Sequence, residues 1–271
     1  MWEHSESMRV VFIGAGRLAS CLAPALQRGG AEVLQVWSRS EASAQALAST
    51  LCCPAVWGAL DGVCRDADVY LLCVRDDVIS DVARSLRAII GPGPIVAHTS
   101  GGTALDDIIV GSNDHVGVFY PLQSFTRGRK IDFSEVHFFL EAIDDTVYCR
   151  LTALAALLTP SSHIHCLATA DRRRMHLAAV FVSNFVNHCC VLAEDILQPT
   201  GLDFKVMRPL LAETVSKLDV MTPVEAQTGP ALRWDERVLD AHRELLIGLD
   251  AMRALYDMLS QSIHKKAIDS Q

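Results

Sequence analysis

The chain has 271 residues, of which 50% are hydrophobic and 21% charged, and its net charge at pH 7 is -8. A chain of this length and composition can bury one large or two modest cores, so we expect a folded rather than a disordered protein. The negative charge offers no broad basic field, so we expect neither nucleic acid nor acidic membrane surfaces as partners.

The nine cysteines do not have the spacing of a disulfide framework or a zinc site. Two pairs are vicinal, Cys52-Cys53 and Cys189-Cys190, and no CxxC motif occurs, so we expect reduced cysteines and no metal. Residues 1–8 are polar and acidic, unlike a secretory signal, and no apolar run approaches the roughly 18 residues that span a bilayer. We therefore expect a cytoplasmic protein that does not contact a membrane.

Residues 9–168 alternate short apolar runs with helix-like segments. This alternation is typical of strands that crossover helices cover on both faces. Strands are predicted over residues 10–13, 33–37, 69–74, 95–98, 117–120, 138–142 and 164–167. Helices are predicted over residues 17–27, 42–49, 78–90 and 146–158. The pattern predicts an α/β domain of the Rossmann type, with a doubly wound, mostly parallel sheet.

The β signal disappears after residue 168. Long amphipathic segments follow over residues 175–197, 206–220 and 235–265. We therefore predict two domains, a dinucleotide-binding domain over residues 1–168 and an all-helical domain over residues 169–271.

The segment over residues 11–19 reads as strand, tight turn and helix, and it matches the pattern GxGxxA. Gly14 permits the turn, Gly16 lets the backbone approach a diphosphate, and Ala19 lets the helix pack on the strand. Glycine-rich turns also occur in other α/β proteins, so the interpretation as a dinucleotide-binding loop depends on the strand and helix that flank the turn. The predicted cofactor residues of this loop are Gly14, Ala15, Gly16, Arg17 and Leu18.

The end of the second strand indicates which dinucleotide binds. An NAD-binding domain places a carboxylate there, whereas this chain has Ser38, Arg39 and Ser40. The arginine can pair with a 2′-phosphate and the serines can donate hydrogen bonds, which favours NADP(H). A solvated Arg39 is the alternative, and the nearby Glu41 keeps NAD open.

Ligands of such sheets bind beyond the carboxyl ends of the strands. Val74, Ser100 and Gly101 follow predicted strands, so we expect them beside the cofactor. Tyr120 and Gln123 follow the next strand and are expected to contact substrate.

Four longer motifs carry a resemblance to known proteins. They lie at residues 98–101, 120–125, 175–185 and 228–235, with His242 following. Through them the chain resembles the NADP-dependent reductases related to pyrroline-5-carboxylate reductase, ketopantoate reductase and deazaflavin-dependent NADP reductase. It is most similar to a family of oxidoreductases of unknown substrate that joins a Rossmann-type domain to a characteristic helical domain. The resemblance covers residues 10 to about 246 and departs at Met175, where relatives have Tyr, and at Trp234, where they have Gly.

Polar residues on the helix over 175–197 are the candidates for chemistry. At about 100° per residue, Ser183 and Asn187 share the face of His176, and Asn184 lies about 80° away. Hydroxyacid dehydrogenases of the superfamily use a lysine here, which this chain lacks. We expect His176 to donate or accept a proton and Asn184 to orient substrate or water, because histidine ordinarily titrates near neutral pH. A histidine satisfied within the core is the alternative.

Later residues complete the predicted site. Arg233 can pair with a substrate carboxylate, and Thr228 offers a hydroxyl beside it. Asp235 is interpreted as a helix cap, and the run Arg172-Arg173-Arg174 as a solvated basic patch.

The predicted function is an NADP-dependent oxidoreductase that transfers a hydride between NADPH and a C=N or C=O carbon of a small anionic metabolite. The alternative is a non-catalytic NADP(H) sensor or scaffold, because a fold does not settle activity. The missing lysine favours the sensor, whereas His176, Asn184 and Arg233 favour the enzyme. Relatives commonly pair through their helical domains, so the resemblance implies a homodimer.

Overall fold

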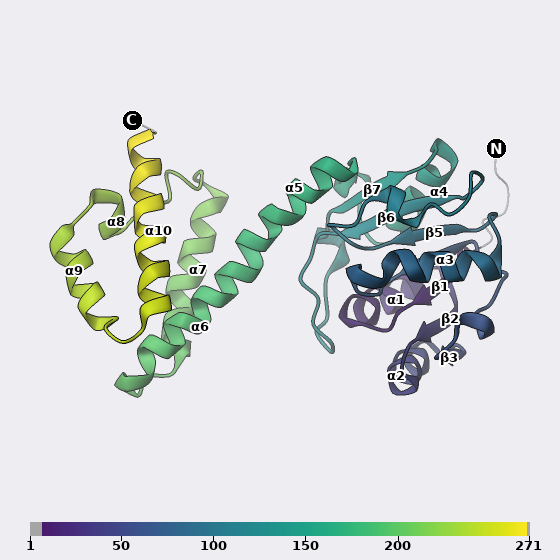
Figure 1. Ribbon diagram of the computed structural model, residues 1–271, viewed down its shortest axis with the longest axis horizontal. Coiled ribbons are helices and arrows are strands. Elements are labelled where there is room, and N and C mark those ends of the chain that lie inside the picture. Colours follow the sequence, from purple (N-terminus) through teal and green to yellow (C-terminus); the bar gives the residue numbers. More distant parts are fainter. Residues whose placement is uncertain (1–6, 270–271) are drawn as a thin grey trace. The chain divides into compact units, whose positions relative to one another are not determined.

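The computed structural model describes residues 7–269, which form two compact units (Figure 1). The first unit ends at Ser183 and the second begins at Asn184. The division falls within a long helical segment, later than the expected domain boundary at residue 168. The first turns of that segment belong to the first unit because the side chain of Arg172 is buried there.

The first unit is built on an eight-stranded sheet with the order β3-β2-β1-β4-β5-β6-β7-β8. The pairs are parallel except β6 with β7, which is antiparallel. The strand order reverses between β1 and β4, which confirms the predicted doubly wound, mostly parallel fold. The strands are β1 (Arg9–Ile13), β2 (Glu32–Ser38), β3 (Ala55–Trp57), β4 (Val69–Leu72), β5 (Ile95–His98), β6 (Val116–Pro121), β7 (Phe138–Ala142) and β8 (Ile164–Cys166).

Helices cover both faces of this sheet (Figure 1). Val10 and Phe12 of β1 pack into one apolar cluster, and Val11 and Ile13 pack into the other. A strand buried on both faces reads as a continuous apolar run, which is why the sequence predicts it well. One face packs against α1 (Arg17–Arg28), α2 (Glu41–Leu51) and α4 (Asp145–Ala156), and the other against α3 (Ile79–Ile90).

The chain after β8 is helical, as predicted, but its helices differ in their bounds. The first begins at Thr169 rather than at residue 175, because the carboxylate of Glu141 on β7 accepts the Thr169 N–H at 2.9 Å. The predicted helix over 235–265 is two helices, with Gly248 at φ +83° between them. The helices are α5 (Thr169–Ala179), α6 (Val186–Leu197), α7 (Arg208–Ser216), α8 (Pro230–Arg233), α9 (Glu236–Leu245) and α10 (Asp250–Asp269), and a π-helical turn, Val180–Phe185, joins α5 to α6.

One helical segment, Thr169–Thr200, is long and apolar enough to cross a membrane by length and composition alone. Its most apolar stretch of 18 residues has a mean hydropathy of 1.5, and none of that stretch is buried. This corrects the expectation that no apolar segment approaches the length of a bilayer span. Uncharged polar residues such as Ser183, Asn184 and Asn187 interrupt the apolar run in the sequence without adding charge.

The backbone conformation at residue 234 is one that favours glycine, the residue that related proteins have where this chain has Trp234. Trp234 ends α8 in the left-handed region, with φ 52° and ψ 52°. Glycine adopts this conformation without steric cost, whereas other residues lose about 1–2 kcal/mol there. The Trp234 ring lies 4.7 Å from that of His264, centroid to centroid, and this contact offsets part of the backbone cost.

Candidate functional site

The turn between β1 and α1 requires glycine at residue 14. Gly14 has φ +117°, and a Cβ built there would lie 2.4 Å from the carbonyl oxygen of Cys73. The Gly14 N–H donates to the Trp37 carbonyl at 2.8 Å. The turn is therefore fixed against the ends of β2 and β4, in a space that no side chain can enter.

The N-terminus of α1 follows this turn and has no side-chain cap. Gly16 is the N-cap residue, and the first helical turn contains no acidic side chain. The first N–H groups of a helix lack partners within the helix, and its dipole places positive charge at this end. This arrangement favours an anion such as a phosphate.

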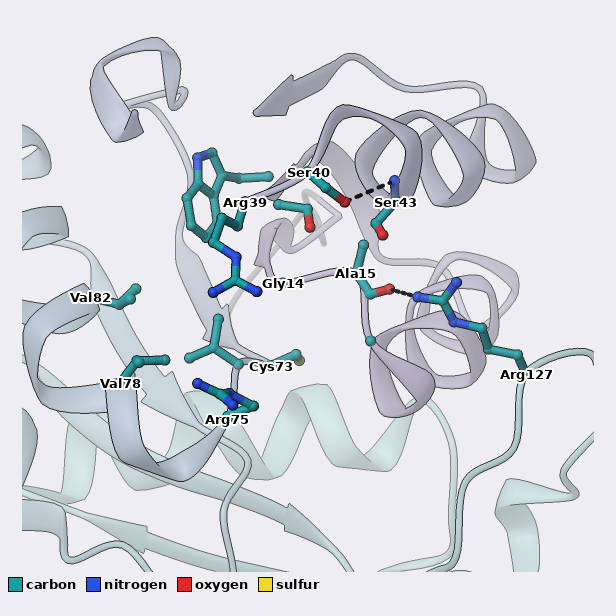
Figure 2. A pocket seen from close by; sticks show the side chains of 14 residues that line it. Gly14, Ala15, Arg39, Ser40, Ser43, Cys73, Arg75, Val78, Val82 and Arg127 are labelled. Atoms are coloured by element: carbon teal, nitrogen blue, oxygen red, sulfur yellow. Dashed lines mark hydrogen bonds between the residues drawn. The ribbon is translucent and has the colours of Figure 1, made fainter. Parts of the chain in front are cut away.

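A cavity of about 390 Å³ opens beside the turn (Figure 2). Several predicted cofactor residues line it, namely Gly14, Ala15, Gly16, Ser38, Arg39, Ser40 and Val74. Residues that sequence reasoning did not place there also line it, among them Trp37, Ser43 and Arg127. Arg17 and Leu18 are not among the lining residues. Arg17 is exposed, and Leu18 packs against the apolar cluster beneath α1.

The lining of the cavity is electropositive. Arg39, Arg75 and Arg127 line it, and no carboxylate does among the described residues. Arg75 pairs with Asp77 at 2.8 Å, whereas Arg39 and Arg127 make no ion pair in the described part of the chain. Figure 2 shows Arg39 and Arg127 on opposite sides of the glycine turn. A dinucleotide with several phosphates fits this lining.

Two predicted residues, Tyr120 and His176, lie together at another part of the carboxyl edge. The Tyr120 hydroxyl is 3.0 Å from His176 Nδ1. Burial raises the pKa of Tyr120, so the phenol keeps its proton. It can therefore donate to a bare Nδ1 or accept from a protonated one. A Cβ on the adjacent Gly101 would lie 2.5 Å from His176 Nδ1, so only glycine fits there.

Ser100 shapes the turn after β5. Its hydroxyl donates to the Asp76 carboxylate at 2.8 Å and accepts the N–H groups of Gly102 and Thr103 at 3.0 Å each. Ser100 does not line the cavity beside Gly14. Asp76 is its partner, and the two residues join the ends of β4 and β5.

Arg172 holds α5 against this turn, which corrects its interpretation as part of a solvated basic patch. Its side chain is completely buried. Nη1 donates to the carbonyls of Ser100, Gly101 and Thr103 at 2.8–3.2 Å. Nη2 donates to Glu141 Oε2 at 2.9 Å. A planar guanidinium presents several N–H groups in one fork, so it can gather carbonyls and a carboxylate at once.

Arg172 also explains where His176 lies. Residues four apart on an α-helix share a face, so Arg172 and His176 project on the same side of α5. By binding the carbonyls of residues 100, 101 and 103, Arg172 brings that face onto the turn that contains Gly101. His176 then meets Tyr120 one helical turn further along.

His98 is a buried histidine beneath the same turn. Its Nδ1 accepts the Ser100 N–H at 3.2 Å. Burial, with a smaller effect from the positive charge of Arg172, lowers the pKa of His98 to about 3. The imidazole is therefore neutral near pH 7, as its accepting role requires.

The remaining predicted catalytic and substrate residues are Gln123, Asn184, Thr228 and Arg233. Gln123 is exposed, and its side chain accepts the N–H of Ser124. Asn184, Thr228 and Arg233 are exposed and belong to the second unit. Asp235 caps α9 as predicted, by accepting the N–H of Val238. The π-helical turn Val180–Phe185 alters the phase assumed for Ser183, Asn184 and Asn187.

Two domain families match the chain. A Rossmann-like domain matches residues 4–111, and a domain of unknown function, DUF2520, matches residues 136–263. No curated protein matches it. A solved structure from Bacteroides fragilis, of a candidate NADP oxidoreductase, is 37% identical with a TM-score of 0.90, and the match covers 96% of this chain and 98% of that one. The chain belongs to the same family as this Bacteroides protein.

This finding confirms the resemblance carried by the four motifs. More distant structures share the fold alone. Pyrroline-5-carboxylate reductase from Coxiella burnetii is 14% identical with a TM-score of 0.59, and the match covers 97% of this chain and 98% of that one. A pyrroline carboxylate reductase from Plasmodium falciparum, solved with NADP bound, is 12% identical with a TM-score of 0.59, and the match covers 96% and 100%.

The low pKa of His98 predicts a specific loss of stability in acid. In the unfolded chain this histidine has its ordinary pKa of about 6.5. Between about pH 6.5 and pH 3 the unfolded state binds a proton that the folded state does not, so the stability that neutral His98 provides above pH 6.5 is lost as the pH falls. His98→Asn keeps an acceptor at the Nδ1 position but does not titrate.

Urea unfolding at pH 7 and pH 5 measures this effect. Between the two pH values, the free energy of unfolding should fall by about 2 kcal/mol more in the wild type than in His98→Asn. The same substitution at the exposed His188 serves as the control and should leave the pH-dependent loss unchanged. Equal losses in the wild type and His98→Asn would show that His98 takes up its proton over the same pH range in the folded and unfolded states, which would contradict the lowered pKa.

Proposed function

We propose that the protein is an NADP-dependent oxidoreductase that transfers a hydride between NADPH and the C=N or C=O carbon of a small anionic metabolite. The observation that carries this proposal is the cavity beside Gly14, which combines an uncapped helix N-terminus with Arg39 and Arg127. Among the described residues these two arginines make no ion pair, and no carboxylate lines the cavity. The family relationship to the Bacteroides candidate NADP oxidoreductase supports it.

Each part of the cavity suits one part of the cofactor. In this proposal the N–H groups of residues 14–16 and the first turn of α1 hold the diphosphate. Arg39 pairs with the 2′-phosphate, and Ser38 and Ser40 donate hydrogen bonds beside it. Val74 lies two residues beyond the end of β4, where the cofactor would cross the reversal in strand order. NADPH supplies the hydride when bound.

His176 is the proposed proton donor and acceptor. Its Nδ1 is held by the Tyr120 hydroxyl, so Nε2 remains for the substrate. When the imidazole is protonated, Nε2–H gives its proton to the reduced nitrogen or oxygen, and Nδ1–H then donates to the Tyr120 oxygen. Tyr120 thus acts as a positioning residue that holds the ring in either protonation state. Asn184, Gln123, Thr228 and Arg233 remain proposed substrate residues.

Arg39 determines the preference for NADPH in this account. Arg39→Ala should weaken NADPH binding by about 10- to 100-fold, because a charge-assisted hydrogen bond contributes about 1.5–3 kcal/mol. NADH lacks the 2′-phosphate, so its affinity should change little. Isothermal titration calorimetry with both dinucleotides measures this. Arg84→Ala, an exposed arginine on α3 outside the cavity, is the control, and equal losses for both dinucleotides would contradict the role of Arg39.

His176 distinguishes an enzyme from a sensor. In a screen of imines and oxo acids with NADPH, His176→Ala should lower turnover by about 100-fold or more, because general acid–base catalysis contributes at least that factor. Tyr120→Phe should lower turnover less than His176→Ala does, and it should change the pH profile of turnover. NADPH absorbance follows turnover, and calorimetry checks that both variants still bind cofactor. Tight NADPH binding by the wild type without turnover across the screen would instead support the sensor.

We also propose that a second copy of the chain covers the exposed apolar segment Thr169–Thr200. This segment bears apolar side chains that are 41–74% exposed, namely Leu177, Val182, Val186, Val191 and Ile196. Burying apolar surface stabilises association by about 25 cal/mol per Å². The net charge of -8 opposes the other possible cover, an anionic bilayer.

Sedimentation equilibrium should give about twice the chain mass of 29.6 kDa at micromolar concentration. Val182→Glu should shift the protein toward the monomer, because it places a charge on the proposed interface. Substitution of the exposed Val110 of the first unit by Glu is the matched control. A monomeric wild type, or a wild type that partitions onto lipid vesicles, would contradict this proposal.

A further inference from the structure

The loop between β6 and β7 returns to α1 and is held there by its own contacts. Arg129 N–H donates to the Thr126 carbonyl at 3.2 Å, with Gly128 between them at φ +76°. The thiol of Cys21 on α1 contacts the carbonyls of Thr126 and Arg129, at 3.6 and 3.8 Å. The residues on both sides of Arg127 are thus tied to the first helix of the dinucleotide motif.

Aromatic packing also holds this loop against the apolar cluster under α1. The Phe125 ring stacks on that of Phe133 with centroids 6.2 Å apart, and Phe125 packs against the apolar cluster under α1. The turn over residues 126–129 is therefore a defined structural element. It presents one side chain, Arg127, to the cavity beside Gly14.

The Arg127 guanidinium lies against the centre of the glycine turn (Figure 2). Nη2 donates to the Ala15 carbonyl at 2.7 Å, although 112 residues separate the two in the sequence. A guanidinium has five N–H groups, and the others of Arg127 donate to no residue in the described part of the chain. Its positive charge is likewise not paired with a carboxylate among residues 7–269. One N–H group of Arg127 is thus bound to Ala15, while the others remain for a ligand.

The two unpaired arginines of the cavity occupy different places. Arg39 follows β2, where the 2′-phosphate is proposed to bind, whereas Arg127 binds the backbone of the glycine turn. A guanidinium at that turn can form two parallel hydrogen bonds with phosphate oxygens, in addition to the amides of α1. The position of Arg127 therefore matches a diphosphate and not the adenosine 2′-phosphate.

We propose that Arg127 is a ligand of the cofactor's diphosphate, supplied from outside the glycine-loop motif, so that two arginines bind two different phosphate groups. This inference rests on the proposed binding of a dinucleotide. Arg127 binds the diphosphate, which NADPH and NADH share, and Arg39 binds the 2′-phosphate, which only NADPH has. The competing interpretation is that Arg127 only fixes the shape of the turn through Ala15.

Three probes separate these interpretations by calorimetry. NADPH carries both phosphate groups, NADH carries only the diphosphate, and 2′-AMP carries only the 2′-phosphate. Arg127→Met should lower the affinity for NADPH and for NADH by the same factor, about tenfold or more, and leave the affinity for 2′-AMP unchanged. Arg127→Lys, which keeps the charge and one donor group, should recover part of the loss. Arg129→Met, in the same turn but outside this cavity, should bind all three probes like the wild type.

The results that would contradict the role of Arg127 differ from those that would contradict the proposed function. Unchanged NADH binding by Arg127→Met would overturn the role of Arg127 alone, provided that the wild type binds NADH. Recovery of wild-type NADH binding by Arg127→Gln, which keeps an N–H donor for the Ala15 carbonyl but no charge, would mean that Arg127 only shapes the turn and would also overturn its role, as would an equal loss for 2′-AMP. A wild type that binds none of the three probes would overturn the proposed function as well. Thermal unfolding of each variant confirms that the chain is folded.

Discussion

The candidate site depends on one steric constraint, the absence of a side chain at residue 14. The turn after β1 lies so close to the Cys73 carbonyl that a Cβ would overlap it at 2.4 Å. This closeness lets one turn join the ends of β1, β2 and β4 at the place where the strand order reverses. The N-terminus of α1 therefore lies at the cavity without a side-chain cap, and no carboxylate of residues 7–269 lines the cavity. Binding of a phosphate follows from this geometry rather than from net charge, which is -8 for the whole chain.

A second interaction places the candidate proton donor. The buried guanidinium of Arg172 binds three carbonyls of the turn after β5 and the carboxylate of Glu141. Glu141 in turn caps the first residue of α5. Removing either partner would leave an uncompensated buried group, which ordinarily costs several kcal/mol. The arrangement therefore holds His176 rigidly beside Tyr120 and Gly101, as a group that exchanges protons at a fixed position would need.

Local patterns in the sequence predicted most of the fold and part of the site. The buried strands read as apolar runs, and the turn at residues 14–16 is visible in its glycine spacing because both signals lie within a few residues. Strand β3, which has three residues, was not predicted. Arg127 could not be predicted as a cavity residue, because its partner Ala15 lies 112 residues away and no motif links them. Arg172 resembles a solvated charge in sequence, and only the tertiary fold buries it. The π-helical turn after α5 likewise leaves no local signal, so the assumed phase of Asn184 did not hold.

A crystal structure of the protein grown with NADPH tests the central claim most directly. The account predicts diphosphate oxygens within hydrogen-bond distance of the backbone amides of residues 14–16, and the adenosine 2′-phosphate against the guanidinium of Arg39. Dinucleotide density elsewhere on the molecule, or a glycine turn filled by protein side chains while NADPH is in excess, would contradict it.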